Sequence, residues 1–171
     1  MRNYFLGLCL LFALCFTACS HSDDSVDVLI IGGGASGVTA GIQSARMGAA
    51  TLIVEETEWL GGMLTSAGVS AVDGNYDLPA GLFGEFREHL ADYYGGLDSL
   101  KTGWVSAVLF EPSVGNKIFH EMVDAEKNLK VWHNATLVKL EREKDVWIAQ
   151  IQMKDNTIKK IHAKILIDGT E

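Results

Sequence analysis

Hydrophobic positions change their spacing several times along this chain, and each spacing predicts a different kind of element. Residues 26–31 and 51–54 are short, nearly continuous apolar runs, as expected for strands buried on both faces of a parallel sheet. A helix is predicted between them, from about residue 36 to 47, with Gly48 as its C-terminal cap. The order strand, glycine-rich turn, helix, strand is one βαβ unit.

Two further helices are predicted in the middle of the chain, after a loop over residues 60–80. The first ends at Gly95-Gly96, and its apolar residues recur at every fourth position: Leu82, Phe86 and Leu90. Pro112 opens the second, because a proline in the first helical turn loses no hydrogen bond. Four apolar residues form the inner face of that helix: Val114, Ile118, Met122 and Val123.

The last third of the chain combines two strand patterns. Residues 129–132 are predicted to be a third parallel strand, and residues 165–167 a buried strand that runs into Asp168-Gly169-Thr170. Between them, apolar and charged residues alternate, with turns near residues 144–145 and 155–156, which predicts an antiparallel meander of two or three strands. The fold class is therefore α/β: a Rossmann-like parallel sheet with a βαβ dinucleotide-binding unit, plus an antiparallel β-meander crossover.

The glycine-rich turn has the pattern G-x-G-x-x-G and lies directly between the first strand and its helix. Gly32 permits a tight turn, Gly34 lacks the Cβ that would block a pyrophosphate, and Gly37 lets the helix pack close to the strand. The helix N-terminus would offer free N–H groups and a partial positive charge to phosphates. We therefore predict cofactor contacts at five residues of this turn: Gly32, Gly34, Ala35, Ser36 and Gly37.

A carboxylate follows the second strand, eighteen positions after Gly37. Glu55 could accept both ribose hydroxyls of an adenosine and would repel a 2′-phosphate, which argues against NADP. Glu56 is the competing candidate, and a plain surface glutamate is the alternative interpretation. The glycine turn and the carboxylate fit both FAD and NAD.

The segment Leu60-Gly61-Gly62-Met63-Leu64-Thr65 resembles the glycine doublet of FAD-dependent oxidoreductases of the glutathione-reductase structural type. The resemblance extends over residues 26–171, including the succession of helix, strand, meander and final strand. It implies FAD as the cofactor and contacts from Gly61, Gly62 and Met63. Residues 133–137 resemble the place where backbone meets adenine, and Leu137 is the implied contact. Glu56 departs from the Arg or Lys usual in that family.

Members of that family are typically much longer than this chain. We therefore expect an N-terminal fragment that lacks its substrate domain and is inactive alone. A small-molecule substrate is implied, but no residue of the chain can be named as catalytic. His89, His120, His133 and His162 lack the spacing of metal ligands, so no metal site is predicted.

Composition excludes two further classes. The chain has 171 residues, 14 Lys plus Arg and 22 Asp plus Glu, so its formal charge is −8 and a nucleic-acid partner is not expected. Intrinsic disorder is excluded because 48% of the residues are hydrophobic. All three cysteines lie within the first 19 residues, so the body of the chain has no disulfide framework.

The N-terminus resembles the signal of a bacterial lipoprotein. Arg2 precedes a run of 13 apolar residues, too short to span a bilayer, and small residues then lead to Cys19. We expect residues 1–18 to be a signal peptide, Cys19 to carry the lipid and residues 19–25 to form a polar tether to the lipid bilayer. An ordinary signal peptide cut near Ala18 is the alternative. The expected location is the bacterial cell envelope, periplasmic or surface-exposed.

These observations give one main hypothesis and two alternatives. Residues 26–171 would be the FAD-binding part of a flavin-dependent oxidoreductase anchored to the membrane as a lipoprotein, with an unidentified substrate. The first alternative is an NAD-binding oxidoreductase of plain Rossmann type. The second is a non-catalytic surface lipoprotein that uses the nucleotide fold as a binding module.

Overall fold

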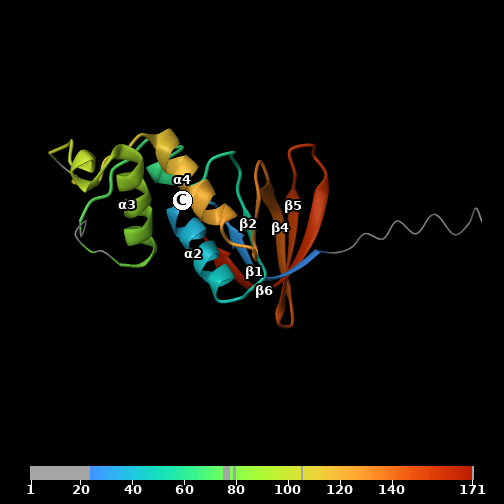
Figure 1. Ribbon diagram of the computed structural model, residues 1–171. Helices are drawn as coiled ribbons and strands as arrows, with labels where there is room; N and C mark the ends of the chain where they lie inside the picture. Colours follow the sequence, from blue (N-terminus) through green and yellow to red (C-terminus); the bar gives the residue numbers. More distant parts are fainter. Residues whose placement is uncertain (1–23, 75–77, 79, 105, 171) are drawn as a thin grey trace, which may run out of the picture.

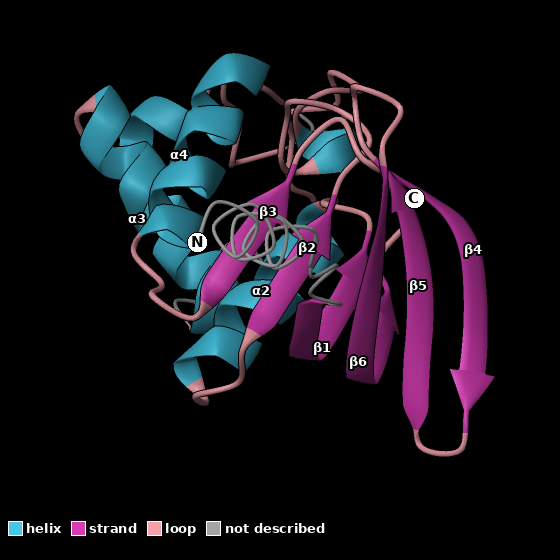
Figure 2. Ribbon diagram, turned by 90° about the vertical axis from the view of Figure 1, so that its right-hand side faces the viewer, coloured by secondary structure: helices cyan, strands magenta, loops and turns pink. Residues whose placement is uncertain are grey.

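A single six-stranded sheet forms the centre of the protein, in a computed structural model that describes residues 24–74, 78, 80–104 and 106–170. The strand order is β3-β2-β1-β6-β5-β4 (Figure 2). The first four strands of that order run parallel, and β6, β5 and β4 are antiparallel. The strands are β1 Asp24–Ile31, β2 Thr51–Val54, β3 Leu129–Trp132, β4 Thr136–Glu143, β5 Val146–Gln152 and β6 Ile158–Asp168. The predicted α/β class is confirmed.

Three α-helices lie on one side of the parallel strands, and the meander lies on the other (Figure 1). They are α2 Ala35–Arg46, α3 Gly81–Tyr94 and α4 Pro112–Asp124, with short 3₁₀ turns η2 at Gly62–Leu64 and η3 at Leu97–Leu100. One apolar core fills the space between helices and sheet, around Ile30, Ile42 and Ile118. A second joins the back of β1 and β2 to the meander, around Leu29 and Ile151. Burial on both faces explains why the runs in β1 and β2 are continuously apolar.

The strand β6 belongs to both halves of the sheet. Residues 158–163 pair antiparallel with β5, and residues 161–168 pair almost without interruption, in parallel, with β1. The sequence predicts a meander and a separate strand at 165–167, whereas one continuous strand curves from the direction of β5 into that of β1 (Figure 1). This curve places the end of β6 beside the end of β1.

Residues 165–167 do form a strand, but the expectation that it is buried is wrong, because Ile165 is 55% exposed and Leu166 and Ile167 are only partly buried. Ile165 pairs with Val28 and therefore shares its side of the sheet. Among the described elements, however, the helices pack over β1, β2 and β3 rather than over β6. The end of β6 is thus placed by its backbone pairing with β1 more than by burial of its side chains.

The ends of several elements agree closely with the sequence predictions. Gly48 follows α2 with a φ of 91°, in the left-handed region expected of a C-terminal cap. The strand β1 begins at Asp24 and so includes the last two residues of the expected tether, 24 and 25.

Residues 1–18 and Cys19, the expected signal peptide and lipid attachment site, lie outside the described residues. No helix among the described residues is both long and apolar enough to cross a membrane.

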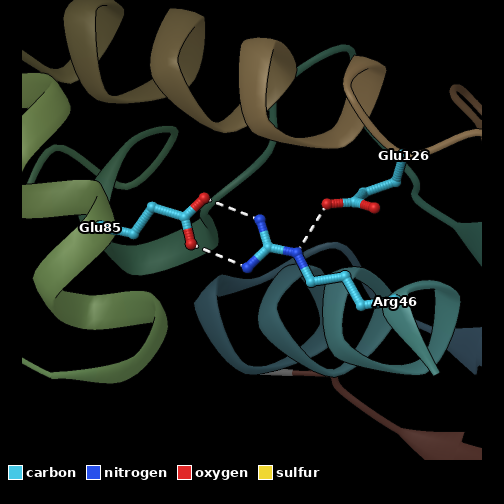
Figure 3. Close-up of polar contacts among 3 residues, drawn as sticks. All are labelled: Arg46, Glu85 and Glu126. Atoms are coloured by element: carbon cyan, nitrogen blue, oxygen red, sulfur yellow. Dashed lines mark hydrogen bonds and ion pairs between the residues drawn. The ribbon is translucent and has the colours of Figure 1, made fainter.

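Arg46, the last residue of α2, links this helix to α3 and to the segment after α4 (Figure 3). Its Nη1 and Nη2 donate to the two carboxylate oxygens of Glu85 on α3 at 2.8 and 2.7 Å. Its Nε donates to Glu126, just beyond α4, at 2.7 Å. This arrangement raises the pKa of Arg46 and lowers the pKa of Glu85. Bidentate pairs of this kind fix orientation as well as distance.

We predict that Arg46→Leu lowers the free energy of unfolding by about 1–2 kcal/mol, because two carboxylates lose a charge-assisted partner at a partly exposed site. The control is Lys101→Leu, which removes an exposed pair with Asp98 and should cost at most about 0.5 kcal/mol. Urea unfolding measures both values.

The loss in Arg46→Leu should also depend on pH. Since the pKa of Glu85 is lowered in the folded state, its stabilisation is fully present above the ordinary value of 4.5 and is lost as pH falls through the lowered value. An equal loss in both variants, or a loss in Arg46→Leu that persists unchanged at strongly acidic pH, would contradict the assignment.

Candidate functional site

An open cleft of about 270 Å³ lies at the carboxyl edge of the parallel strands. It is lined by the ends of β1 and β2, the glycine loop, Gly62 at the start of η2, Ala135 and Leu137, and Gly169-Thr170 after β6. Ligands of open α/β sheets bind at this edge, outside the carboxyl ends of the strands. The cleft is therefore the first candidate for a binding site.

The glycine loop is shaped by contacts that leave no room for side chains. Gly32 has a φ of 96°, and a Cβ there would lie 2.5 Å from the carbonyl oxygen of Gly169. A Cβ on Gly37 would collide with the carbonyl oxygen of Gly32. The tight turn at Gly32 and the close helix packing at Gly37 are thus confirmed. Gly34 is the N-cap of α2 and lines the cleft.

The beginning of α2 suits an anion. No side chain caps the helix, and its first turn contains no acidic residue. The first N–H groups of an α-helix have no partner within the helix, and the helix dipole places a partial positive charge there. A cradle of glycines in front of such a terminus fits the diphosphate of a dinucleotide.

Glu55 lies in the wall of the cleft, and hydrogen bonds from Gly33 and Thr57 hold its carboxylate in place. Its Oε2 accepts a hydrogen bond from the Gly33 N–H at 2.7 Å. Its Oε1 accepts from the N–H and the hydroxyl of Thr57 at 2.8 and 2.7 Å. A carboxylate offers about four lone-pair sites. One site is therefore left for a ribose hydroxyl, and a second hydroxyl would compete with Thr57.

The glycine doublet adjoins the glycine loop. The Gly61 N–H donates to the Gly33 carbonyl oxygen at 2.8 Å, and Gly34 and Gly61 form an isolated parallel bridge. Gly61 has a φ of 105°, and a Cβ there would lie 2.6 Å from the Phe119 ring. The two glycine motifs, which the sequence places 24 residues apart from Gly37 to Gly61, thus meet at the cleft.

The predicted contact residues divide into two groups. Those that line the cleft are Gly32, Gly34, Glu55, Gly62 and Leu137. The others lie beside it: Ala35, Ser36 and Gly37 in the first turn of α2, Gly61 behind Gly62, and Met63, which is 55% exposed in η2. Their assignment as cofactor contacts stays a prediction. Glu56, the competing carboxylate, also lines the cleft.

Several lining residues were not predicted as contacts. Thr57 lies in no motif, and Ala135 lies within residues 133–137, where Leu137 alone was implied as a contact. Gly169 and Thr170 could have been found, because the ends of neighbouring parallel strands meet at one edge, but only once β6 is known to lie beside β1. Asp168 accepts hydrogen bonds from the N–H and hydroxyl of Thr170, which lower the pKa of its carboxyl. Within the described part of the chain, no group of three or more candidate ligands could hold a metal ion.

Fold and cleft together define a dinucleotide-binding domain of the βαβ type. The chain belongs to the FAD dependent oxidoreductase family, whose model matches residues 27–171. Membership indicates FAD as the cofactor and decides between the two dinucleotides that the sequence left open. A comparison with curated proteins gave no match.

Solved structures share the fold at low sequence identity. The myxobacterial chondrochloren halogenase CndH, described as a variant of FAD-dependent halogenases, has a TM-score of 0.63 and 12% identity, over 86% of this chain and 37% of that chain. The bacillithiol disulfide reductase Bdr from Bacillus cereus has a TM-score of 0.58 and 14% identity, over 86% and 40%. L-proline dehydrogenase from P. horikoshii has a TM-score of 0.52 and 18% identity, over 85% and 22%. The chain thus spans well under half the length of these three.

We predict that Glu55→Gln weakens FAD binding by about tenfold, because an amide cannot accept from both Gly33 and Thr57 and also from a ribose hydroxyl. The matched control is Glu56→Gln, which should change the affinity by less than about threefold. Quenching of FAD fluorescence on titration with protein measures both. A larger effect at Glu56 than at Glu55 would reverse the assignment.

Proposed function

We propose that this chain is the FAD-binding part of a flavin-dependent oxidoreductase that acts on a small-molecule substrate. The observation that carries the proposal is the meeting of three segments at one cleft: the glycine loop, Glu55 and the glycine doublet. Bound flavin would supply the redox chemistry by accepting electrons from a donor and passing them on. The finer assignment to the glutathione-reductase structural type stays a prediction, supported by the doublet and the meander.

The chain's own residues would bind and orient the cofactor. The N-terminus of α2 would stabilise the diphosphate through N–H groups and dipole, while Glu55 would hold the adenosine sugar. Gly32 and Gly34 would let the diphosphate approach the backbone. Leu137 and Ala135 would offer an apolar surface to the adenine, since both line the cleft.

We further propose that this chain binds its cofactor without turning over substrate by itself. The length comparison supports this, because 22–40% of each of three solved chains corresponds to it. Substrate, electron acceptor and catalytic residues would then be determined by parts of a longer protein.

The cell envelope is the proposed location, with Cys19 as the lipidated residue. Support comes from the sequence alone: a positive residue, a short apolar run and small residues before the cysteine. Several acyl chains together anchor a protein firmly, since each buried CH₂ contributes about 0.8 kcal/mol.

Purified protein should take up FAD, appear yellow and show a flavin absorption spectrum. The fluorescence of FAD should be quenched on binding, whereas NADH should not bind tightly. A colourless protein that takes up no added FAD would overturn the proposal. In that case, tight NADH binding would favour the NAD alternative, and the absence of both would favour a binding module.

Replacing the proposed lipid attachment site tests the location. We predict that Cys19→Ser abolishes incorporation of labelled fatty acid and releases the protein from the membrane fraction, because no thiol remains to be acylated there. Cys15→Ser is the matched control and should leave both unchanged. Labelling that persists in Cys19→Ser would disprove the assignment.

A further inference from the structure

The chain segment that leads from Glu55 to the glycine doublet is held by two side chains whose roles the sequence does not predict. Leu60 is fully buried and precedes the doublet directly. Its N–H donates to the Asn116 Oδ1 on α4 at 2.8 Å, and its carbonyl oxygen accepts from the Thr65 hydroxyl at 2.6 Å. Both backbone groups of one buried residue are thus satisfied by side chains rather than by a neighbouring strand.

These two bonds hold the two peptides on either side of Leu60: Asn116 holds the peptide before it and Thr65 the peptide after it. The Leu60 carbonyl and the Gly61 N–H belong to the same peptide, and that N–H donates to the Gly33 carbonyl in the glycine loop. Buried backbone groups are almost always paired, so Thr65 fixes the plane of this peptide directly, and Asn116 fixes the plane of the peptide before it and with it the backbone at Leu60. The direction of the Gly61 N–H toward the Gly33 carbonyl therefore depends on Asn116 and Thr65.

Aromatic side chains on and beside α4 pack tightly against the glycine doublet. A Cβ on Gly61 would lie 2.6 Å from the Phe119 ring, which stacks on Phe86 of α3 with ring centroids 4.4 Å apart. Gly115 leaves space in the same way for Phe110, which lies edge-on to Phe86. The doublet cannot relax toward α4, because these rings already fill the space. A lost hydrogen bond at Leu60 would instead turn the doublet within the cleft.

We propose that Asn116 and Thr65 are positioning residues for the cofactor, which hold Gly61-Gly62 against the glycine loop on the diphosphate side of the cleft. The proposal rests on the proposed function. It separates two parts of the site: Glu55 at the adenosine side is held by Gly33 and Thr57, whereas the doublet is held from α4. Loss of either the Asn116 or the Thr65 bond should therefore weaken binding of FAD but not of AMP, which lacks the second phosphate and the flavin.

Variants of Asn116 distinguish this role from a purely structural one. Asn116→Leu removes the acceptor at similar size and should weaken FAD binding about tenfold while AMP binding changes less than twofold. Asn116→Asp retains an oxygen acceptor and should restore FAD affinity to within about threefold of the wild type. Lys117→Leu makes a comparable substitution at the next, exposed position of α4 and should change neither affinity.

Thr65→Val is a second, independent test, because it removes the partner of the Leu60 carbonyl at nearly constant size and should again weaken FAD binding selectively. It decides the question if Asn116→Leu does not fold. FAD fluorescence quenching and calorimetric titration with AMP give the affinities, and thermal unfolding reports folding.

Three results would overturn the inference: unchanged FAD affinity in Thr65→Val and in a folded Asn116→Leu, equal loss of FAD and AMP, or no rescue by Asn116→Asp. If the wild type binds FAD, such a result refutes the positioning role alone. A wild type that binds no FAD refutes the proposed function and this inference together.

Discussion

The backbone of Gly33 is hydrogen-bonded on both sides, and the arrangement of the cleft depends on these two bonds. Its N–H donates to Glu55 and its carbonyl accepts from Gly61. The glycine loop, the end of β2 and the doublet are thereby fixed to one another, although they are far apart in sequence. Neither bond is part of a regular strand or helix. A Cβ at position 33 would lie 2.9 Å from the Glu55 carboxylate and from Leu60, so a side chain there would displace the Glu55 carboxylate that the Gly33 N–H binds.

The curved strand β6 supplies the remaining wall. Its last residues pair with β1 and bring Gly169-Thr170 to the glycine loop, where the Gly169 N–H donates to the Ile31 carbonyl at 2.7 Å. Its first residues pair with β5 and carry the meander over the back of the sheet. One strand therefore couples the second apolar core to the cleft. Packing of the meander against Leu29 stabilises β1 from behind, while α2 covers it in front.

Local patterns were sufficient to predict most elements and the centre of the site. The bounds of β2 and β3 and the first residue of α4 follow from apolar runs and from Pro112, because these signals are contained within a few residues. The continuity of β6 was not predictable, since its two halves have different neighbours and different burial. Asn116 was missed for a similar reason: a single asparagine on a helix has no periodic signal, and its partner Leu60 lies 56 residues away. The sequence thus reveals glycine motifs, but not the side chains that hold them.

Electrostatics at the cleft are decided by nearby donors and not by the net charge. A chain of formal charge −8 would repel a diphosphate at long range, but salt screens such repulsion beyond about 8–10 Å. Glu55 in the cleft wall and Glu58, which follows Thr57 along the chain, already have hydrogen-bond partners. Glu55 accepts three hydrogen bonds. Glu58 pairs with Lys154 at 3.1 Å, and this bond is the main reason why the pKa of the Glu58 carboxyl is lowered. The start of α2 adds N–H donors without any acidic residue in its first turn. Charge-assisted hydrogen bonds from such donors are about twice as strong as neutral ones, so an acidic protein can still bind an anionic dinucleotide at this edge.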